Sequence, residues 1–145
     1  VEVPAVAINA NFFAKELDYL SIVTNDLIQY SVAIDRTDDS VSHLYNSIHP
    51  SVLKLMAETI KAGKKYNKQV AVCGEMAGDP KLTRLLLGMG VENFSMHPSS
   101  ILHVKKQILS TNISKLKGLI NKIMNTNEPE VIETLILKIN LISNE

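Results

Sequence analysis

Short apolar runs alternate with helix-patterned segments along most of the chain. Residues 70–72 form an apolar run that we expect to be a buried β-strand, and residues 19–23 and 91–96 are expected to be further short strands. Residues 1–8 are apolar and β-branched apart from Glu2 and Pro4, which indicates the end of a buried strand that turns into a helix through residue 17. The pattern therefore predicts four short strands.

Helical segments are expected after each of these strands. A helix over residues 27–34 follows the second strand, and residues 51–68 carry apolar side chains at helical spacing with Ser51 as the expected cap. Gly90 follows a helix expected over residues 81–87, where a glycine suits the carboxyl end of a helix. Further amphipathic helices are expected over residues 101–109, 113–124 and 129–142.

The order of strand and helix repeats predicts an α/β fold with a parallel sheet. About four βα units correspond to the C-terminal half of a (β/α)8 TIM barrel, with residues 1–110 as βα units and residues 111–145 as C-terminal helices of one partial barrel domain. An open Rossmann-like sheet is the alternative, but no Gly-x-Gly-x-x-Gly follows a strand. The chain opens without methionine inside an apolar segment, so we expect a piece of a longer polypeptide.

Composition narrows the possible partners and compartment. Fifteen basic and fifteen acidic residues cancel, so no nucleic acid or membrane partner is expected. The single cysteine excludes an intrachain disulfide and fits a reducing compartment, which makes the cytoplasm the expected location. No apolar run approaches the roughly 18 residues that a membrane-spanning helix needs.

Side chains that can bind a ligand or take part in catalysis lie where the expected strands end. In parallel strands these ends share one rim, which is where α/β folds usually carry their sites. Glu2 and Asp26 supply carboxylate oxygens of the kind Mg²⁺ prefers, and Arg36 in the long loop over residues 35–50 can bind a phosphate or carboxylate. The rim residues are Glu2, Asn25, Asp26, Cys73, Glu75 and residues 95–97. Together they indicate a site for a magnesium-bound phosphorylated anion.

Each of these residues also has a purely structural interpretation. A cysteine after Val-Ala-Val is commonly an inert core residue, and Asp26 can serve as a helix cap. Glu2 and Arg36 can be ordinary surface charges, and the four histidines lack metal-ligand spacing. Spacing alone leaves these alternatives open, and only the coincidence at the strand ends favours a functional site.

Several longer motifs carry a resemblance to a known family. They are Cys-Gly-Glu-Met-Ala-Gly-Asp-Pro at 73–80, Thr-Asn-Asp-Leu-Ile-Gln-Tyr at 24–30, Asp-Arg-Thr-Asp-Asp at 35–39, Ser-His-Leu-Tyr at 42–45, Leu-Leu-Leu-Gly-Met-Gly at 85–90 and Phe-Ser-Met at 94–96. The chain resembles Enzyme I of the bacterial phosphotransferase system over nearly its whole length. Pyruvate phosphate dikinase and phosphoenolpyruvate synthase share the barrel but differ in the cysteine loop.

The resemblance implies a phosphoenolpyruvate-binding barrel with Mg²⁺ as cofactor. Glu2 and Asp26 match the magnesium ligands, while Asn25, Asp26 and Arg36 match the phosphoenolpyruvate contacts. Cys73 matches the acid that protonates the enolate carbon to give pyruvate. Val23 stands where the family usually has glycine before Thr-Asn-Asp, which predicts a small shift of that loop.

The resemblance also implies partners. The phosphoryl group passes to a histidine on a separate N-terminal domain, then to a phosphocarrier protein and onward to sugar uptake, and the barrel forms a homodimer. That histidine lies in a Thr-Ser-His-Ala context which this chain lacks, so none of its histidines is assigned the role. The alternative function is a dimerisation or phosphoenolpyruvate-sensing module of a regulatory paralogue that is not catalytic by itself.

Overall fold

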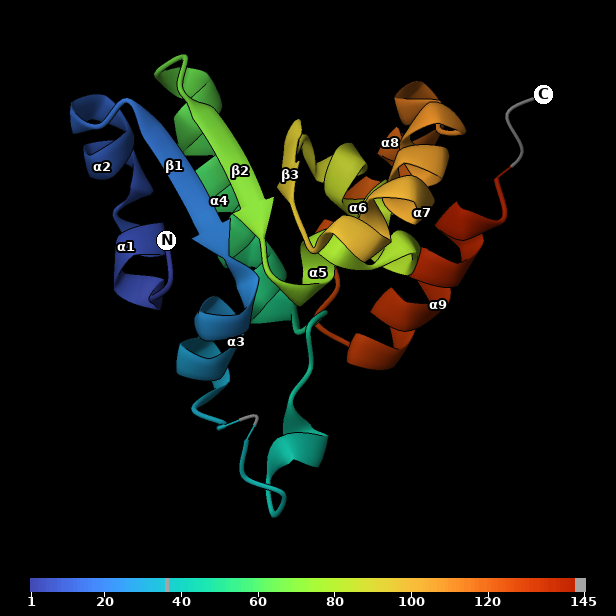
Figure 1. Cartoon of the computed structure of the whole chain (residues 1–145), viewed down its shortest axis with the longest axis horizontal. Helices are drawn as coiled ribbons and strands as arrows, with labels where there is room; N and C mark the ends of the chain where they lie inside the picture. Colours follow the sequence, from blue (N-terminus) through green and yellow to red (C-terminus); the bar gives the residue numbers. More distant parts are fainter. Residues whose placement is uncertain (36, 143–145) are drawn as a thin grey trace.

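Figure 1 shows the computed structural model, which describes residues 1–35 and 37–142. The elements are α1 (Pro4–Ile8), α2 (Ala10–Glu16), β1 (Tyr19–Val23), α3 (Thr24–Val32), the 3-10 helix η1 (Ser42–Leu44), α4 (Pro50–Lys65), β2 (Gln69–Cys73), α5 (Glu75–Gly78), α6 (Pro80–Met89), β3 (Asn93–Ser95), α7 (Pro98–Leu109), α8 (Ile113–Met124) and α9 (Pro129–Asn140). Among the described helices, none combines the length and the apolar character needed to cross a membrane.

The described strands form one small parallel sheet in the order β1-β2-β3. Leu20 lies opposite Val70, and Val72 lies opposite Phe94, so neighbouring strands in the sequence are also neighbours in space. The short apolar runs thus become strands as predicted. Parallel strands need a long crossover between them, and the helical segments between these strands supply it.

The expectation of four strands is corrected to three within the described residues. Helix α1 begins at Pro4, because proline lacks an N–H and its fixed φ suits the first helical position. Only Val1 retains strand-like pairing: its nitrogen donates to the Ser21 carbonyl, and the Val23 N–H donates to the Val1 carbonyl at 3.1 Å. Glu2 therefore follows a segment that pairs with β1, although that segment is not a strand.

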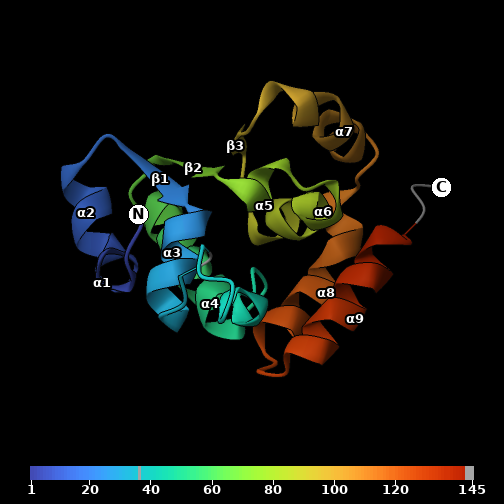
Figure 2. The ribbon, with the colours of Figure 1, turned by 60° about the horizontal axis from the view of Figure 1, so that its bottom comes forward.

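One face of the sheet is covered by α4, which carries the apolar stripe predicted for it. Val52, Met56 and Ile60 of α4 are buried and pack in one core with the alternate strand residues Leu20, Ile22, Val70 and Val72. Figure 2 shows α4 on one side of β1 and β2. The burial of this apolar stripe stabilises the unit by roughly 25 cal/mol per Å² of apolar surface removed from water.

The other face of the sheet carries smaller and more polar side chains. By the two-residue period of a strand, Ser21, Val23, Ala71, Cys73 and Ser95 share this face. No helix of the described part of the chain lies over it in front of β1 and β2 in Figure 1. The molecule is thus a helix-rich α/β unit whose small sheet is packed on one side.

Helix starts differ from the sequence-based expectation in two places. Helix α3 begins directly after β1, so Thr24, Asn25 and Asp26 form its first turn and do not precede it. Helix α4 is capped by His49, whose Nδ1 accepts from the Ser51 N–H at 3.3 Å, and not by Ser51 itself. His97 caps α7 in the same way through the Ser99 N–H. Both histidines belong to a His-Pro-Ser sequence, which sets this cap.

In the polar segment predicted as a loop over residues 35–50, the described residues 37–49 form a loop that contains η1, and Pro50 already belongs to α4. Local side-chain turns hold it, because Asp38 Oδ1 accepts from both the hydroxyl and the N–H of Ser40, at 2.6 and 2.9 Å. The Ser40 hydroxyl is the larger cause, and with the Ser40 N–H it holds the pKa of the Asp38 carboxyl below its ordinary value. These bonds fix the backbone around Ser40 in the described part of the loop.

The C-terminal helices α8 and α9 pack against α6 and extend the core. Leu116 and Ile123 of α8 and Ile132 and Ile139 of α9 are almost completely buried in the same cluster as Leu85 of α6. Figure 2 shows α8 and α9 side by side along the edge of the molecule, below α6. These helices are integral to the described core.

Candidate active site

The carboxyl ends of the three described strands meet at one edge, which fixes the rim predicted from the sequence. Val23 lies opposite Cys73, and Cys73 lies opposite Ser95, so the last residues of β1, β2 and β3 are in register. In Figure 1 the arrowheads of β1 and β2 point to the same end of the molecule, where α3 and α5 begin. Asn25 and Cys73 are thereby brought to one place from positions far apart in the sequence.

The turn after β2 is held against the first turn of α3 by two side chains. The Thr24 hydroxyl donates to the Cys73 carbonyl at 2.9 Å, and Asn25 Oδ1 accepts from the Glu75 N–H at 3.1 Å. Thr24 is completely buried, so its bond is shielded from water. Sequence reasoning assigned Asn25 to substrate but did not foresee its contact with the Glu75 backbone or the bond of Thr24 to the Cys73 carbonyl.

Gly74 is required by the geometry of this turn. Its φ of +94° lies in a region that residues with a side chain rarely adopt. A Cβ at this position would lie 2.6 Å from Thr24 Oγ1 and 3.0 Å from Asn25 Oδ1. The glycine thus allows the Cys73–Glu75 backbone to approach α3 closely enough for both hydrogen bonds.

The sulfur of Cys73 is half-buried and has polar neighbours, unlike an inert core cysteine. Its Sγ lies 3.5 Å from the Ile22 carbonyl and 3.6 Å from the Ser21 hydroxyl oxygen. Both neighbours come from β1, the adjacent strand. Sequence reasoning did not single out Ser21, although its place two residues before Val23 on the same face of β1 is a usable signal.

The two predicted carboxylates follow neighbouring segments at this rim. Glu2 is exposed just after Val1, which pairs with β1, and Asp26 is half-buried in the first turn of α3. Within residues 1–35 and 37–142, no group of three or more His, Cys, Asp or Glu side chains is arranged to hold a metal ion. The described residues therefore offer two carboxylates and no complete protein cage. Arg36, the predicted phosphate ligand, lies outside the described residues.

A hollow lies in the rim beside the cysteine. Its lining combines the turn after β2, the end of β3 and the start of α7; the residues are Asn25, Cys73, Gly74, Glu75, Gly78, Asp79, Pro80, Ser95, Met96, His97 and Ser100. Residues 95–97 were expected at the rim and are confirmed there. Gly78 and Ser100 were not expected there. They lie close together, since a Cβ at Gly78 would be 3.2 Å from Ser100 Oγ.

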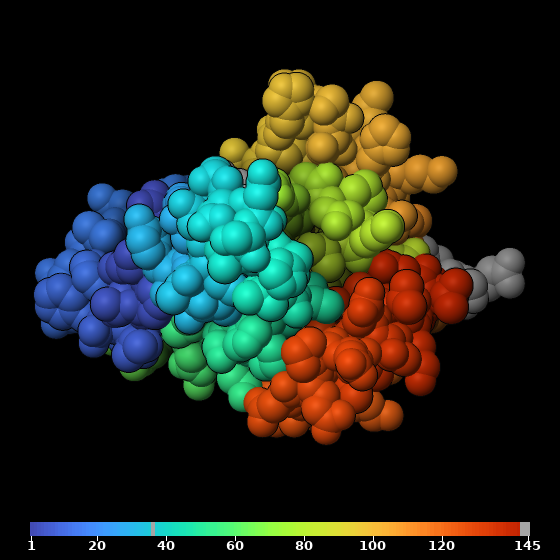
Figure 3. All heavy atoms as spheres, turned by 90° about the horizontal axis from the view of Figure 1, so that it is seen from below, coloured from blue at the N-terminus to red at the C-terminus, as the bar shows by residue number. Residues whose placement is uncertain are grey.

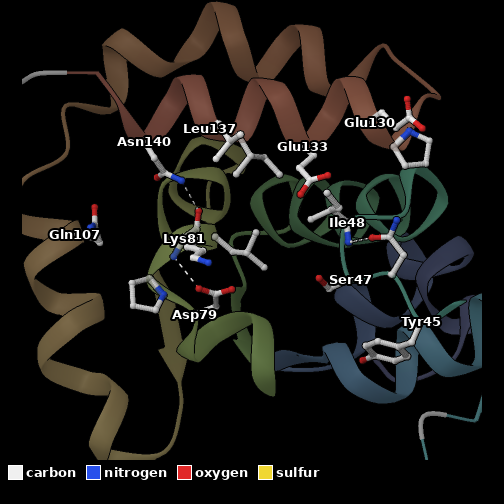
Figure 4. Close-up of a pocket in the computed structure, with 15 residues that line it drawn as sticks. Tyr45, Ser47, Ile48, Asp79, Lys81, Gln107, Glu130, Glu133, Leu137 and Asn140 are labelled. Atoms are coloured by element: carbon white, nitrogen blue, oxygen red, sulfur yellow. Dashed lines mark hydrogen bonds between the residues drawn. The ribbon is translucent and has the colours of Figure 1, made fainter. Parts of the chain in front are cut away.

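A second hollow adjoins the first and shares Asp79 and Pro80 with it. Figure 3 shows this side of the molecule, where the loop before α4, the start of α6 and helix α9 come together. In Figure 4, Asp79 accepts from the Lys81 N–H and Asn140 donates to the Lys81 carbonyl, both at 2.8 Å. Glu133 and Leu137 of α9 face Ile48 across this hollow. These contacts tie the start of α6 to α9.

Comparisons with known proteins match the part of the chain that carries this rim to a protein family. The profile of the family described as "PEP-utilising enzyme, PEP-binding domain" matches residues 1–113, which is most of the chain. The chain belongs to this family. The matched range contains the whole sheet, the turn after β2 and both predicted carboxylates.

Curated relatives of this PEP-binding domain carry the name phosphoenolpyruvate-protein phosphotransferase. The relative from Cupriavidus necator is 49% identical over 130 residues, which are 90% of this chain and 22% of the relative. The relative from Haemophilus influenzae is 50% identical over 82% of this chain and 21% of its own length, and that from Staphylococcus aureus is 46% identical over 92% and 23%. The chain thus spans about a fifth of the relatives that it matches.

Proposed function

We propose that this chain is the part of a phosphoenolpyruvate-protein phosphotransferase that carries the cysteine side of its active site. The observation that carries the proposal is the rim itself, inside the matched PEP-binding domain. There the Glu75 N–H, two residues after Cys73, donates to Asn25 Oδ1 and holds the cysteine turn beside Asn25. The shared name of the relatives supports the reaction class. The expected product is pyruvate, and the transferred group is the phosphoryl group of phosphoenolpyruvate.

Glu2 and Asp26 are proposed to hold Mg²⁺ at the rim. The two carboxylates fit such an ion, because neither has a hydrogen bond or ion pair within the described part of the chain, and oxygen ligands suit Mg²⁺. When bound, the ion supplies positive charge that offsets the charge of the substrate phosphate. Asn25, Asp26 and Arg36 are proposed as phosphoenolpyruvate contacts, with Asn25 already oriented by its bond to Glu75.

Cys73 is proposed as the acid that completes the reaction. After the phosphoryl group has left, the S–H bond of Cys73 breaks, and its proton forms a C–H bond with the terminal carbon of the enolate. The sulfur keeps the electron pair as thiolate and takes a new proton from water. A thiol suits this step because it remains protonated at neutral pH and still gives up a proton readily. Its half-buried place beside the hollow is compatible with access of a small anion.

The wider assembly is proposed from the same family membership. The phosphoryl group is accepted by a histidine on a separate N-terminal domain and passed to a phosphocarrier protein, the first step of sugar uptake. The protein is proposed to be a cytoplasmic homodimer. Residues 1–145 are proposed as one partial barrel domain, with βα units over 1–110 and C-terminal helices over 111–145.

Two features support completion of the sheet as a (β/α)8 barrel. The face that carries Ser21, Ala71 and Cys73 has small side chains, which suits the inside of a closed barrel. Val1 bonds to the free side of β1 as a parallel neighbour would, so a further strand position exists there. Closure would remove the exposed edge of β3 as well.

The test is the Cys73→Ala variant of the full-length enzyme. We expect pyruvate formation to fall by at least about a thousandfold, because no proton donor then reaches the enolate carbon, while Mg²⁺-dependent phosphoenolpyruvate binding stays within about threefold. Binding is measured by isothermal titration, and turnover by pyruvate release. Cys73→Ser serves as a matched variant of similar size with a weaker acid. Normal turnover of Cys73→Ala would remove Cys73 from the mechanism.

An assembly or sensing module is the second candidate function. The exposed leucines of α7, Leu102 and Leu109, favour it, because each is 77% exposed and apolar. Titration of the full-length protein with phosphoenolpyruvate and Mg²⁺ separates the candidates. Binding with turnover supports the enzyme, binding without turnover supports a sensor, and no binding supports a purely structural role.

A further inference from the structure

The environment of the Cys73 sulfur contains one group that the proposed reaction has not yet used. We propose that the Ser21 hydroxyl is a positioning residue, which orients the Cys73 thiol and donates a hydrogen bond to the thiolate that protonation of the enolate leaves behind. This inference rests on the proposed function, in which Cys73 is the proton donor. It adds a residue on the neighbouring strand to the machinery.

The first step of the argument is the register of the sheet. Val23 lies opposite Cys73, so Ser21 sits two residues earlier on the same face of β1. The Ser21 hydroxyl oxygen and the Cys73 sulfur are 3.6 Å apart, which is within hydrogen-bond distance for sulfur. A strand places this contact more rigidly than a loop would, because the ladder bonds of β1 and β2 fix both Cα positions.

The second step is the chemistry of the two sulfur neighbours. The Ile22 carbonyl, 3.5 Å from the sulfur, can only accept a hydrogen bond, so it binds the thiol but not the thiolate. The Ser21 hydroxyl can accept from the thiol or donate to the thiolate. Of these two contacts, only that of Ser21 persists in both protonation states. Rotation of the hydroxyl hydrogen is enough to follow the change.

The third step is the rigidity of the cysteine itself. The Thr24 hydroxyl fixes the Cys73 carbonyl, and Gly74 brings the following backbone against α3. The sulfur therefore cannot leave Ser21 by backbone movement without breaking these contacts. Hydrogen bonds to a charged group are stronger than neutral ones, so the Ser21 contact strengthens when the thiolate forms.

Other titratable groups at the rim act equally on every variant proposed below. They are Glu2 beside β1, Asp26 on α3, Glu75 on α5, Asp79 before α6 and His97 before α7. None is changed by a substitution at Ser21. A difference between hydroxyl-bearing and hydroxyl-free variants therefore belongs to the hydroxyl.

The experiment measures alkylation of Cys73 in the full-length protein by iodoacetamide, followed by mass spectrometry of the peptide that contains it. Ser21→Ala is expected to lower the rate at neutral pH about fivefold to tenfold and to move the pH profile upward, because the thiolate loses its donor. Turnover of phosphoenolpyruvate should fall by a similar factor, with KM within about twofold of the unaltered enzyme.

A second pair of variants separates the hydroxyl from packing. Ser21→Thr and Ser21→Val have nearly the same shape and both suit a strand, but only threonine keeps the hydroxyl. Threonine should restore the alkylation profile and the turnover, and valine should not. Ser51→Ala, at an exposed serine on α4, is the control and should leave both unchanged. The pair also carries the test where Ser21→Ala does not fold.

The inference is overturned by an alkylation profile of Ser21→Ala or Ser21→Val that coincides with that of the unaltered protein. Its failure is distinct from failure of the proposed function. Full turnover in Cys73→Ala would remove the cysteine from catalysis, whereas the alkylation measurement reports on the Ser21–sulfur contact whether or not the enzyme turns over. A KM change without a turnover change would assign Ser21 to substrate binding and would also overturn the proposal.

Discussion

The rim of the sheet and the packing of α6, α8 and α9 are held together by different interactions. At the rim, one hydrogen bond donated by Thr24 and one accepted by Asn25 hold a half-exposed turn around Cys73 and Gly74. In the helical region, fully buried apolar side chains such as Leu85, Leu116 and Ile123 form a continuous core. The rim is therefore held by few contacts, whereas the helical region is held by closely packed apolar side chains.

One buried cation distinguishes the helical region further. Arg84 of α6 is 7% exposed, and its guanidinium donates to the carbonyls of Ile139, Asn140 and Ile142 at the end of α9 and of Ser110 at the end of α7. These carbonyls lie at the carboxyl ends of α7 and α9 or just beyond α9, where the helix dipole is negative, and the Ile139 carbonyl also accepts from the Ile142 N–H at 3.3 Å. Arginine thus replaces water at two helix ends.

The comparison teaches where substitutions should act. Changes in the helical region should lower the free energy of unfolding and leave the chemistry of the folded protein intact. Changes at the rim should alter turnover more than stability, because few buried contacts depend on them. Each substitution below tests this division, and the thermodynamic effect decreases from one to the next.

Replacement of Arg84 by alanine should give the largest loss of stability. We expect about 3 kcal/mol, because the contacts of the guanidinium with four carbonyls disappear together, and a polar group that loses its partner costs about 1–3 kcal/mol. Urea unfolding followed by circular dichroism measures the loss. Lys138→Ala removes an exposed cation from α9 and should change stability by less than about 0.5 kcal/mol. A loss below about 1 kcal/mol for Arg84→Ala would show that water can replace the guanidinium.

Replacement of Gly88 by alanine should disturb the contact of α6 with α8. The added Cβ would lie 2.4 Å from Ile120 Cγ1, and such overpacking costs about 1–3 kcal/mol. The matched control is Gly118→Ala on α8, where nothing lies within 4 Å of the added Cβ. That control should raise stability by about 0.5–1 kcal/mol, since alanine favours a helix more than glycine does.

The outcome that contradicts this prediction is equal stability of the two glycine variants. A second check is the double variant Gly88→Ala with Ile120→Ala, in which the shortened side chain at position 120 leaves room for the Cβ added at position 88. The double variant should lose less than the sum of the two single losses, as expected for residues in contact. Turnover per folded molecule should be unchanged in all of these helical variants.

Replacement of Gly74 by alanine should lower turnover more than it lowers the free energy of unfolding. We expect a stability loss of about 1–2 kcal/mol, from the φ of +94° and the close approach of a Cβ to Thr24 Oγ1. Pyruvate formation should fall at least about a hundredfold, because the turn that presents Cys73 shifts. Turnover per folded molecule, with folding followed by circular dichroism, checks this. A variant with lowered stability and normal turnover would contradict the division between the two regions.

The fold was predictable wherever a short segment sets its own structure. The segments predicted as strands at 19–23, 70–72 and 91–96 contain the three described strands, and helix α8 has the predicted bounds of 113–124. The first eight residues were predicted less well, because apolar β-branched residues suggest a strand while Pro4 starts a helix. The caps of α4 and α7 also differed, since a histidine Nδ1 can accept the bond that a serine was expected to accept.

The candidate site was predictable as a set of strand ends but not as a set of contacts. Cys73, Asn25 and residues 95–97 do share one rim, as parallel strands require. The bonds from the Thr24 hydroxyl to the Cys73 carbonyl and from the Glu75 N–H to Asn25 Oδ1 join residues about fifty positions apart in the sequence. No local pattern encodes them, because they depend on how α3 is set against the turn after β2.

The sequence by itself determined the alternation of strands and helices, the glycine-rich turn after Cys73 and the family resemblance. These follow from local periodicity, from backbone conformations that only glycine tolerates, and from long motifs. Tertiary structure alone decided that the Ser21 hydroxyl faces the Cys73 sulfur and that Arg84 closes the ends of α7 and α9. Both depend on the relative positions of separate elements, which arise when the apolar faces of the sheet and helices are buried together.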